Sequence, residues 1–241
     1  MASTSAFYAV VAGVGAGTGR SLALRFARAY PVVLIARNPS SYDSVVAEIR
    51  QQGGEARGIS ADTSDPAAVA SALDSNVRGL FNFAQATLPS LLDAVPTSPH
   101  PPTLLITGAT GSVRGSARFG TFAAGKFAVR ALGQSLAREF GPKGVHVAHV
   151  IVDGVIDIPR TRGFTVNDGK EDGKISPDAI AESYWHLHTQ HRSSFTQELD
   201  LRPFIRFRMR RPVTWPTPGA QWNGEGAPCG LAAIDPGRSA W

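Results

Sequence analysis

An aromatic residue and a lysine stand four positions apart in the stretch TFAAGKFAV, residues 121–129. In a helix this spacing places Phe122 and Lys126 on one face, one turn apart. A phenol in such a position can give or take a proton, whereas the phenyl ring of Phe122 cannot. The pair therefore offers a positive charge beside a ring that has no acid–base chemistry.

A second candidate site is the glycine-rich stretch AGVGAGTGR, residues 12–20, which follows an apolar run and opens an amphipathic helical pattern. Glycines let the backbone turn tightly and approach a pyrophosphate, which then lies on the free N–H groups of the helix N-terminus. The stretch predicts a dinucleotide phosphate site. The alternative is a glycine-rich loop that binds no ligand.

The end of the second apolar run indicates which dinucleotide is preferred. An acidic residue there would accept hydrogen bonds from the ribose 2′-hydroxyl of NAD, but the sequence has Arg37. Arg37, together with Arg20 at the head of the first helix, suits a 2′-phosphate. The residues therefore favour NADP(H) over NAD; the alternative for Arg37 is an exposed, solvated side chain.

The elements that must position these residues alternate along the chain. Apolar runs predict buried strands at residues 7–12, 32–36, 104–107 and 145–152, and further strands are predicted at residues 56–60 and 196–201. Helical patterns cover residues 18–30, 42–51, 66–73, 76–92, 122–140 and 177–188. Repeated β-α-β units predict an α/β fold with a Rossmann-like, doubly wound parallel sheet in a single domain. We expect this domain to cover residues 5–203, followed by a disordered tail, residues 206–241, rich in Pro, Gly, Arg and Trp.

The motifs resemble those of the short-chain dehydrogenase/reductase family over most of residues 5–203. The resemblance rests on the spacing Gly13-x-x-x-Gly17-x-Gly19, on Asn76-Val77-Arg78-Gly79 and on Lys126. In that family an Asn, a Ser, a Tyr and a Lys act together in hydride transfer. The resemblance implies an oxidoreductase that acts on a small-molecule substrate. It also implies that the protein forms homo-oligomers.

Carried over residue by residue, the resemblance assigns Asn76 and Lys126 to the Asn and Lys positions. Phe122 stands at the Tyr position and Ala109 at the Ser position, so both groups that touch the substrate oxygen are lost. The segment VDGVIDI, residues 152–158, stands where the family has Pro-Gly-x-Val-x-Thr, with Asp153 and Ile158 as departures. The implied cofactor-binding residues are Gly13, Gly17, Thr18, Gly19, Arg37, Asp62, Lys126 and Ile156. The resemblance implies that Asp62 contacts the adenine. The alternative role for Asp62 is to cap a turn.

The lost phenol bears on the reaction. Reduction of a ketone generates an alkoxide that needs a proton, whereas reduction of an iminium generates a neutral amine. The sequence thus predicts that ordinary ketone reduction is impaired and iminium-type reduction is favoured. Replacement groups would have to come from hydroxyls at Thr110, Ser112 or Ser116, or from the stretch SYWHLHTQH with Tyr184, His186, His188 and His191. The alternative for that stretch is a partly solvated helix with incidental histidines.

One strand of the family sheet is missing from the sequence. The family fits two helices and a strand ending in Asn-Asn-Ala-Gly between the positions of Asp62 and Leu104, but this chain has no such motif there. We therefore expect the sheet to lack a central strand next to the cofactor, leaving backbone pairing groups exposed.

Composition limits the other classes of function. The net charge is +5, and the tail contributes +3 of it with five Arg against Glu225 and Asp235. The body is therefore nearly balanced and is not expected to bind nucleic acid. No apolar run is long enough to span a membrane, no secretory signal is found, and the single Cys229 fits a reducing compartment, so we expect a cytoplasmic protein. No metal site is expected.

Two other functions stay open at this point. The chain could be a cofactor-binding protein without redox activity, either a cyclase or isomerase or a catalytically dead regulator. It could also be a partner-binding module built on the Arg- and Trp-rich tail.

Overall fold

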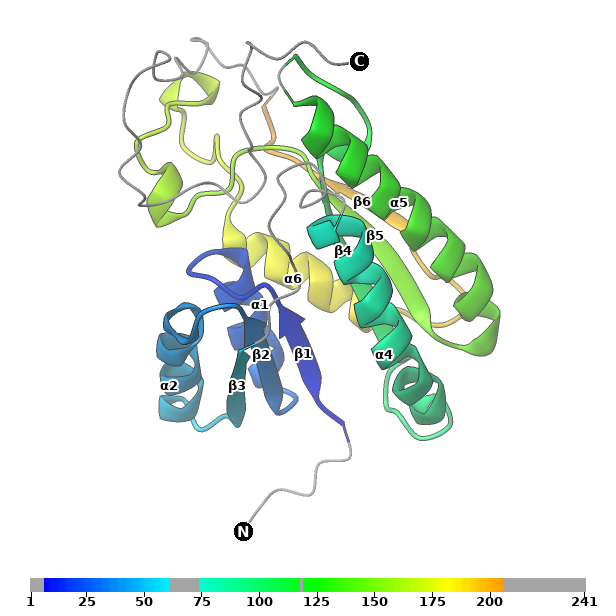
Figure 1. The fold of residues 1–241 in the computed structure, drawn as a ribbon. Helices are drawn as coiled ribbons and strands as arrows, with labels where there is room; N and C mark the ends of the chain where they lie inside the picture. Colours follow the sequence, from blue (N-terminus) through cyan, green and yellow to red (C-terminus); the bar gives the residue numbers. More distant parts are fainter. Residues whose placement is uncertain (1–6, 61–73, 118, 206–241) are drawn as a thin grey trace.

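The structure, a computed structural model, describes residues 7–60, 74–117 and 119–205 of the 241-residue chain. The described α-helices and strands alternate along the sequence, as Figure 1 shows. The strands are β1 (Ala9–Ala12), β2 (Val32–Ala36), β3 (Ala56–Ser60), β4 (Thr103–Ala109), β5 (His146–Val152) and β6 (Glu198–Leu201). The α-helices are α1 (Thr18–Ala27), α2 (Asp43–Gln51), α4 (Gly79–Ala94), α5 (Gly120–Phe140) and α6 (Pro177–His188). A π-helical turn, η2 (Asp74–Arg78), leads into α4, and a 3-10 turn, η3 (Thr110–Ser112), follows β4.

The strands form two parallel sheets of three strands each, in the orders β1-β2-β3 and β4-β5-β6. In the first sheet Ala9 lies opposite Val32, and in the second Thr103 lies opposite His146. Helices connect successive parallel strands, which confirms the predicted α/β fold of the Rossmann type.

Among the described residues, no strand pairs with the edge of β1 opposite β2 or with the edge of β4 opposite β5. The described elements between β3 and β4 are η2 and α4, so the two sheets share no strand pairing in the described part of the chain. Residues 61–73, which lie between β3 and η2, are outside the described residues, so the predicted loss of a central strand stays a prediction. The helix expected over residues 66–73 lies outside the described residues, as does the tail from residue 206.

Helices cover the second sheet on both faces. Along β5, Val147 packs with α4 and α5, whereas Ala148 and Val150 pack with α6. All seven residues of β5 are buried for this reason. The alternation follows from the strand period of two, which sends neighbouring side chains to opposite faces.

Among the described elements, helices cover one face of the first sheet. Val32 and Leu34 are buried against α1 and α2, while Val33 and Ile35 on the opposite face are half-buried. No residue of β1 is fully buried. Helix α1 also packs against α6, so these two helices hold the sheets together. Among the described helices, none is both long and apolar enough to cross a membrane.

Candidate functional site

The glycine-rich loop turns sharply at the carboxyl end of β1. Gly13 has a φ of +77°, a conformation that L side chains rarely adopt, and the N–H groups of Gly13 and Val14 both donate to the carbonyl of Ile35. This contact anchors the loop on β2. A Cβ added to Gly19 would lie 3.0 Å from Val14 Cα, so the loop and the first turn of α1 approach closely.

The N-terminus of α1 fits a phosphate group. No side chain caps it at Gly17, and the first turn holds no acidic residue. The first backbone donors that bond within this turn are Arg20 N, to Gly15 O, and Ser21 N, to Gly17 O. The amides of Thr18 and Gly19 precede them, so they are the groups that would bond an anion.

Ile158 lies directly against this loop. Its Cγ2 lies 2.6 Å from the position that a Cβ on Gly17 would take, so any side chain at position 17 would collide with it. Ile158 follows β5, and Gly17 follows β1. The contact therefore shows that the carboxyl ends of the two sheets meet. It also places a methyl group where the family resemblance implies a threonine hydroxyl.

The two arginines expected at the ribose lie in different surroundings. Arg37 directly follows β2 and is exposed. Arg20 is engaged by Glu48 of α2 through both carboxylate oxygens, with Nε 2.8 Å from Oε2. A guanidinium that is already paired with a carboxylate attracts a second anion more weakly. The expected pairing of both arginines with one 2′-phosphate is therefore not supported, and Arg37 is the better candidate ligand for that phosphate. Asp62 lies outside the described residues.

Phe122 and Lys126 share one face of α5, as the spacing predicts. Lys126 Nζ lies 6.0 Å from the centre of the Phe122 ring and donates to the carbonyl of Thr107 at 3.3 Å. The ring itself covers Gly111, where a Cβ would lie 2.8 Å from its Cε1. The structure thus brings Phe122 beside the turn that follows Ala109.

Two of the three hydroxyls suggested as replacements are engaged within the chain. Ser112 is fully buried, and its Oγ accepts the N–H of Ala109 at 3.1 Å. Thr110 donates its hydroxyl proton to Asp153. Ser116 lies on the exposed part of the loop before α5. Ser112 and Thr110 therefore do not replace the serine hydroxyl and the tyrosine phenol that positions 109 and 122 lack.

Asp153 is a candidate functional residue that sequence reasoning treated only as a departure. Its N–H donates to Leu201 O at 2.7 Å, and its carboxylate accepts from Thr110 and lies 3.6 Å from Arg202. The side chain is half-buried at the carboxyl end of β5. The available signal was an acidic residue directly after the buried run VHVAHVIV, residues 145–152.

Asn76 is half-buried within η2, and α5 packs against η2. The structure therefore brings the elements that carry Asn76 and Lys126 together. Ile156 lies in the segment after β5, where it forms a parallel bridge with Ile175. That bridge fixes the segment on the side of the sheet where the glycine loop lies.

The stretch with Tyr184 and the histidines does not supply a replacement acid. His188 bonds Thr103 Oγ1 through Nδ1 and Tyr30 through Nε2, both at 3.0 Å. Thr103 begins β4 and Ala109 ends it, so the two positions lie about 20 Å apart along the strand at 3.3 Å per residue. Tyr184 is buried against Thr107, and burial raises its pKa to about 12.

The remaining two histidines of that stretch are exposed on α6 and just after it. His186 Nε2 lies 3.4 Å from Gln190 Nε2, and His191 Nδ1 bonds Ser193 Oγ at 2.8 Å. The stretch is therefore a partly solvated helix, with Tyr184 and His188 facing the core and His186 exposed. Sequence periodicity alone did not separate the inward from the outward residues.

Burial of His188 predicts a pH-dependent stability. Desolvation, followed by repulsion from His100 and His146, lowers its pKa to about 4. The unfolded chain, with an ordinary histidine pKa of about 6.5, binds the proton first, so the free energy of unfolding should fall as pH drops from about 6.5 to about 4. The loss should be roughly 2–3 kcal/mol, at 1.36 kcal/mol per unit. Urea unfolding of wild type and His188→Gln across this range measures it; an equally steep loss in the variant would contradict the assignment.

A second buried histidine lies behind the site. His149 Nδ1 bonds Glu198 at 3.1 Å, and Arg130 of α5 binds the same carboxylate through two bonds of 2.7 Å. Burial lowers the pKa of His149, and Arg130 lowers the pKa of Glu198. The neutral form of His149 is therefore favoured at pH 7, and its Nε2, buried against Gly108, has no hydrogen-bond partner among the described residues.

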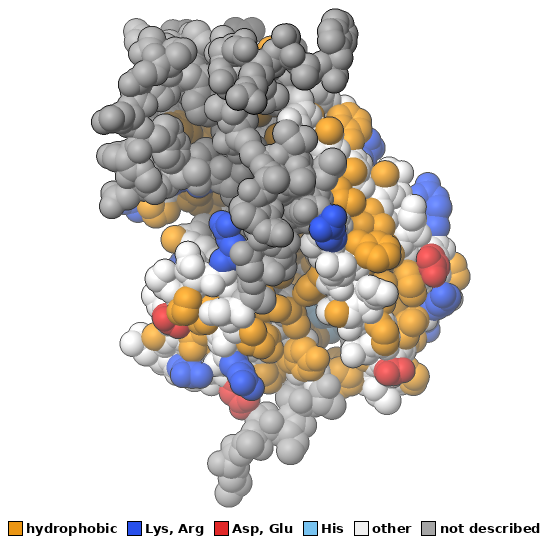
Figure 2. Space-filling view, in the orientation of Figure 1, with side chains coloured by type: hydrophobic (Ala, Val, Ile, Leu, Met, Phe, Trp, Pro, Cys, Tyr) orange, Lys and Arg blue, Asp and Glu red, His pale blue; other side chains and the backbone are white. Residues whose placement is uncertain are grey.

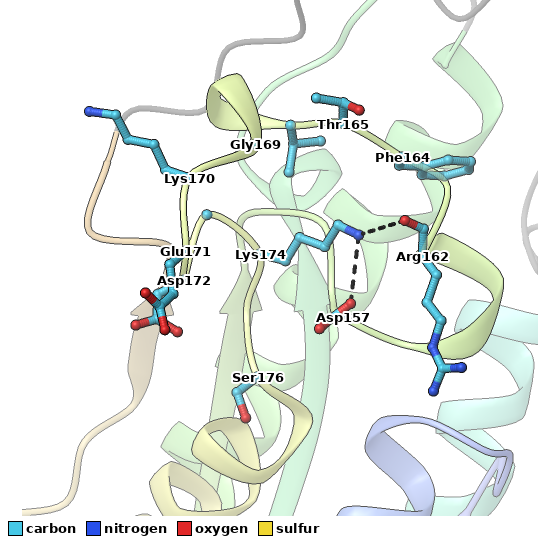
Figure 3. Close-up of a pocket in the computed structure, with 12 residues that line it drawn as sticks. Asp157, Arg162, Phe164, Thr165, Gly169, Lys170, Glu171, Asp172, Lys174 and Ser176 are labelled. Atoms are coloured by element: carbon cyan, nitrogen blue, oxygen red, sulfur yellow. Dashed lines mark hydrogen bonds and ion pairs between the residues drawn. The ribbon is translucent and has the colours of Figure 1, made fainter.

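The loop between β5 and α6 forms a pocket of about 500 Å³. Figure 3 shows Lys174 reaching across it to Asp157 and to the carbonyl of Arg162. Lys174 also donates to Thr161 O at 2.8 Å. Asp157 in its lining is next in sequence to Ile158, which contacts Gly17, so this pocket adjoins the segment that reaches the glycine loop. Charged residues of both signs line it.

Comparisons with known proteins agree with the fold. The family model described as short chain dehydrogenase matches residues 8–75, and the model described as enoyl-(acyl carrier protein) reductase matches residues 63–179. A relative from Staphylococcus epidermidis, named an uncharacterized oxidoreductase, is 31% identical over 131 residues, which is 54% of this chain and 53% of the relative. The chain spans about half the length of the curated relatives it matches.

Solved structures match a larger part of the chain. A short-chain dehydrogenase from Rhodopseudomonas palustris is 27% identical, with a TM-score of 0.63, over 81% of this chain and 99% of that one. A metagenomic short-chain oxidoreductase solved with NADP has a TM-score of 0.66 at 21% identity, over 82% of this chain and 97% of that one, which shows the shared fold. The two family matches run without a gap from residue 8 to residue 179. The chain belongs to the short-chain dehydrogenase/reductase family.

Proposed function

We propose that this chain is an NADP(H)-dependent oxidoreductase that acts on a small organic substrate. The observation that carries the proposal is the meeting of the glycine loop after β1 with the segment after β5, through Gly17 and Ile158. Parallel α/β sheets bind their ligands at this carboxyl edge. Lys126 lies on the same side, at the carboxyl half of β4.

The preference for NADP(H) is supported by Arg37. Its exposed guanidinium follows β2, the strand end where an NAD-specific site carries an acidic residue. A guanidinium there can bond a 2′-phosphate through two parallel N–H groups. The amides of Thr18 and Gly19 would hold the pyrophosphate, and Lys126 would hold the nicotinamide ribose.

The substrate class favoured by the site is an iminium or another cationic acceptor. When bound, the reduced nicotinamide would supply a hydride that forms the new C–H bond, while the C=N π electrons become the nitrogen lone pair. No proton is needed for that balance, so Phe122 and Ala109 would not limit the step. The carboxylate of Asp153 at this edge already accepts from Thr110 and lies 3.6 Å from Arg202, so the preference for a cation rests on the missing phenol and hydroxyl rather than on Asp153.

Cofactor titration tests the proposal. Wild type should bind NADPH more tightly than NADH, and Arg37→Asp should weaken NADPH binding about 10- to 100-fold, because a charged hydrogen bond contributes roughly 1.5–3 kcal/mol. Arg28→Asp is the matched control, since Arg28 is exposed at the opposite end of α1. Quenching of protein fluorescence by each nucleotide gives the affinities. No binding of either nucleotide would remove the proposal.

A second function is favoured by one observation, the loss of both groups that would touch a substrate oxygen. The chain would then bind NADP(H) without redox chemistry, as a cyclase, an isomerase or a regulator. Incubation with NADPH and a cyclic imine separates the two functions. Oxidation of NADPH that depends on the imine supports the reductase, and tight binding without turnover on any acceptor supports the second function.

A further inference from the structure

The turn that follows Ile158 is tied to the residues before it. It comprises the 3-10 turn η5 (Pro159–Thr161) and Arg162, whose φ of −55° and ψ of −39° continue the helical conformation. The hydroxyl of Thr161 donates to Ile156 O at 2.5 Å and accepts the N–H of Ile158 at 3.0 Å. These two bonds fix the direction in which the chain leaves Ile158.

Lys174 holds the same turn from the pocket side, as Figure 3 shows. Its Nζ donates to Thr161 O at 2.8 Å and to Arg162 O at 3.3 Å, and it lies 3.6 Å from a carboxylate oxygen of Asp157. The side chain of Lys174 is 19% exposed, so these contacts are largely shielded from water and are stronger for it. The backbone of Arg162 is therefore held in place, while its side chain is exposed.

The side chain of Arg162 extends toward the glycine loop. In Figure 3 its guanidinium points out of the pocket, toward the blue ribbon that carries the glycine loop and α1. Ile158, four positions earlier, touches that loop, with its Cγ2 2.6 Å from the position that a Cβ on Gly17 would take. Side chains four positions apart on a helical turn face the same way. The spacing and the view therefore agree on the direction of Arg162.

The glycine loop offers a pyrophosphate hydrogen-bond donors rather than a full positive charge. The donors are the amides of Thr18 and Gly19, while Arg20 in the same turn binds both carboxylate oxygens of Glu48. Ile158 presents a methyl group where the family resemblance implies a hydroxyl. On the face drawn in Figure 2, the coloured Lys and Arg side chains are scattered rather than gathered in one patch. An anion at the loop is therefore best matched by an individual guanidinium from a neighbouring segment.

We propose that Arg162 is a side-chain ligand for the pyrophosphate of the dinucleotide, reaching the glycine loop from the segment after β5. Its guanidinium can donate two parallel N–H groups to phosphate oxygens, while the amides of Thr18 and Gly19 donate from α1. The inference rests on the proposed nucleotide binding. It assigns different roles to two arginines: Arg37 binds the 2′-phosphate that only NADP(H) carries, and Arg162 binds the group that NAD(H) and NADP(H) share.

Lys174 is a positioning residue in this arrangement. Its bonds to two successive carbonyls, those of Thr161 and Arg162, hold the backbone from which the guanidinium extends. Lys174 therefore acts on the pyrophosphate through Arg162. Its removal would let the turn move without removing a ligand of the anion.

Affinities for nucleotides and their fragments test the role of Arg162. Arg162→Gln should weaken binding of ADP, NADPH and NADH alike, each by about tenfold or more, because a hydrogen bond to a charged group is lost. Adenosine 2′-monophosphate has a 2′-phosphate but no pyrophosphate, so Arg162→Gln should leave its affinity unchanged. Isothermal titration calorimetry on the full chain measures all four ligands. A loss confined to NADPH would assign Arg162 to the 2′-phosphate and overturn the proposal.

Arg160→Gln is the matched control for the loss of charge. Arg160 is an exposed residue of the same turn. Residues two positions apart on a helical turn point in different directions, so Arg160→Gln should change each affinity by less than about twofold. Arg162→Lys, which keeps the charge but loses the paired donors, should restore only part of the affinity. Equal losses in Arg160→Gln and Arg162→Gln would show a general effect of net charge and would overturn the assignment.

A double-variant cycle tests the positioning role of Lys174. Lys174→Met should weaken ADP binding by about threefold or more in the wild-type background and change it little in Arg162→Gln, because the two side chains act in sequence on one anion. Equal losses in both backgrounds would overturn the positioning role.

Chemical modification of the wild type gives a readout that needs no variant. Phenylglyoxal reacts with accessible guanidinium groups, and ADP should protect Arg162 while Arg160 stays reactive, as measured by mass spectrometry of the digested chain. Unchanged ADP affinity in Arg162→Gln, or labelling of Arg162 that ADP does not slow, would overturn the inference and leave nucleotide binding intact. Failure of the wild type to bind any of these ligands would instead overturn the proposed function, and the inference with it.

Discussion

Phe122→Tyr combined with Ala109→Ser should raise kcat/KM for simple ketones by about 10²-fold, the usual scale of positioned acid–base help. Tyr at position 122 would bring a phenol over Gly111, within reach of the turn that follows position 109. Lys126, one turn away, would lower the pKa of that phenol through its charge. The Tyr proton and the Ser hydrogen bond act on one oxygen, so the two changes should be non-additive.

The single variants and the substrate supply the controls for this expectation. Phe122→Tyr alone should help only in part, because position 109 would still offer no hydroxyl and Thr110 donates its proton to Asp153. Reduction of iminium substrates should change little, since that reaction needs no proton. Efficient ketone reduction by wild type, with a neutral pH optimum abolished by His186→Gln, would contradict the account of the site. A double variant that binds NADPH but stays inert on every acceptor would place the defect in the missing strand.

Gly108→Ala should lower the free energy of unfolding by about 2–3 kcal/mol, the upper part of the range for overpacking a core. A Cβ at position 108 would lie 2.2 Å from His149 Nε2 and 2.8 Å from Ser112 Oγ. His149 cannot swing away without breaking its bond to Glu198, and Gly108 is held by the pairing of β4 with β5. Denaturant unfolding of both proteins measures the difference.

Gly115→Ala is the matched control for this effect, because a Cβ at position 115 would have no atom within 4 Å. It should change stability by less than about 0.5 kcal/mol, as surface substitutions usually do. Adding His149→Ala to Gly108→Ala should cost less than the two single changes together, since the collision disappears. Full additivity, or a stable Gly108→Ala protein, would show that the ring is not fixed as described.

The sequence predicted the order and nature of the elements well because each is specified locally. The apolar run of β2 and the helix α6 were predicted with the bounds that the structure has. Positions 109, 122 and 126 could be assigned from the sequence because they belong to a motif with fixed spacing. That motif runs from the end of one strand to one face of the following helix. The loss of a central strand was predicted from the short chain length between Asp62 and Leu104, and it stays a prediction because residues 61–73 lie outside the described residues.

The contacts that were not predicted join residues distant in sequence. Arg20 meets Glu48 on α2, and His188 meets Tyr30 and Thr103, through packing that no local pattern encodes. Sequence periodicity on α6 placed His188 on a helix but did not say which end of the sheet that helix covers. The pairing of Thr110 with Asp153 likewise depends on the register of β4 with β5.

The division into two sheets has a consequence for cooperativity. An intact doubly wound sheet transmits unfolding from strand to strand, whereas here the coupling between halves rests mainly on the contact of α1 with α6. Residues 7–60 then form a separate foldon, able to open while the segment from β4 to β6 stays folded. Calorimetry should give a measured enthalpy larger than the van't Hoff enthalpy, the mark of more than one transition. A dinucleotide that touches both halves would merge the two transitions into one.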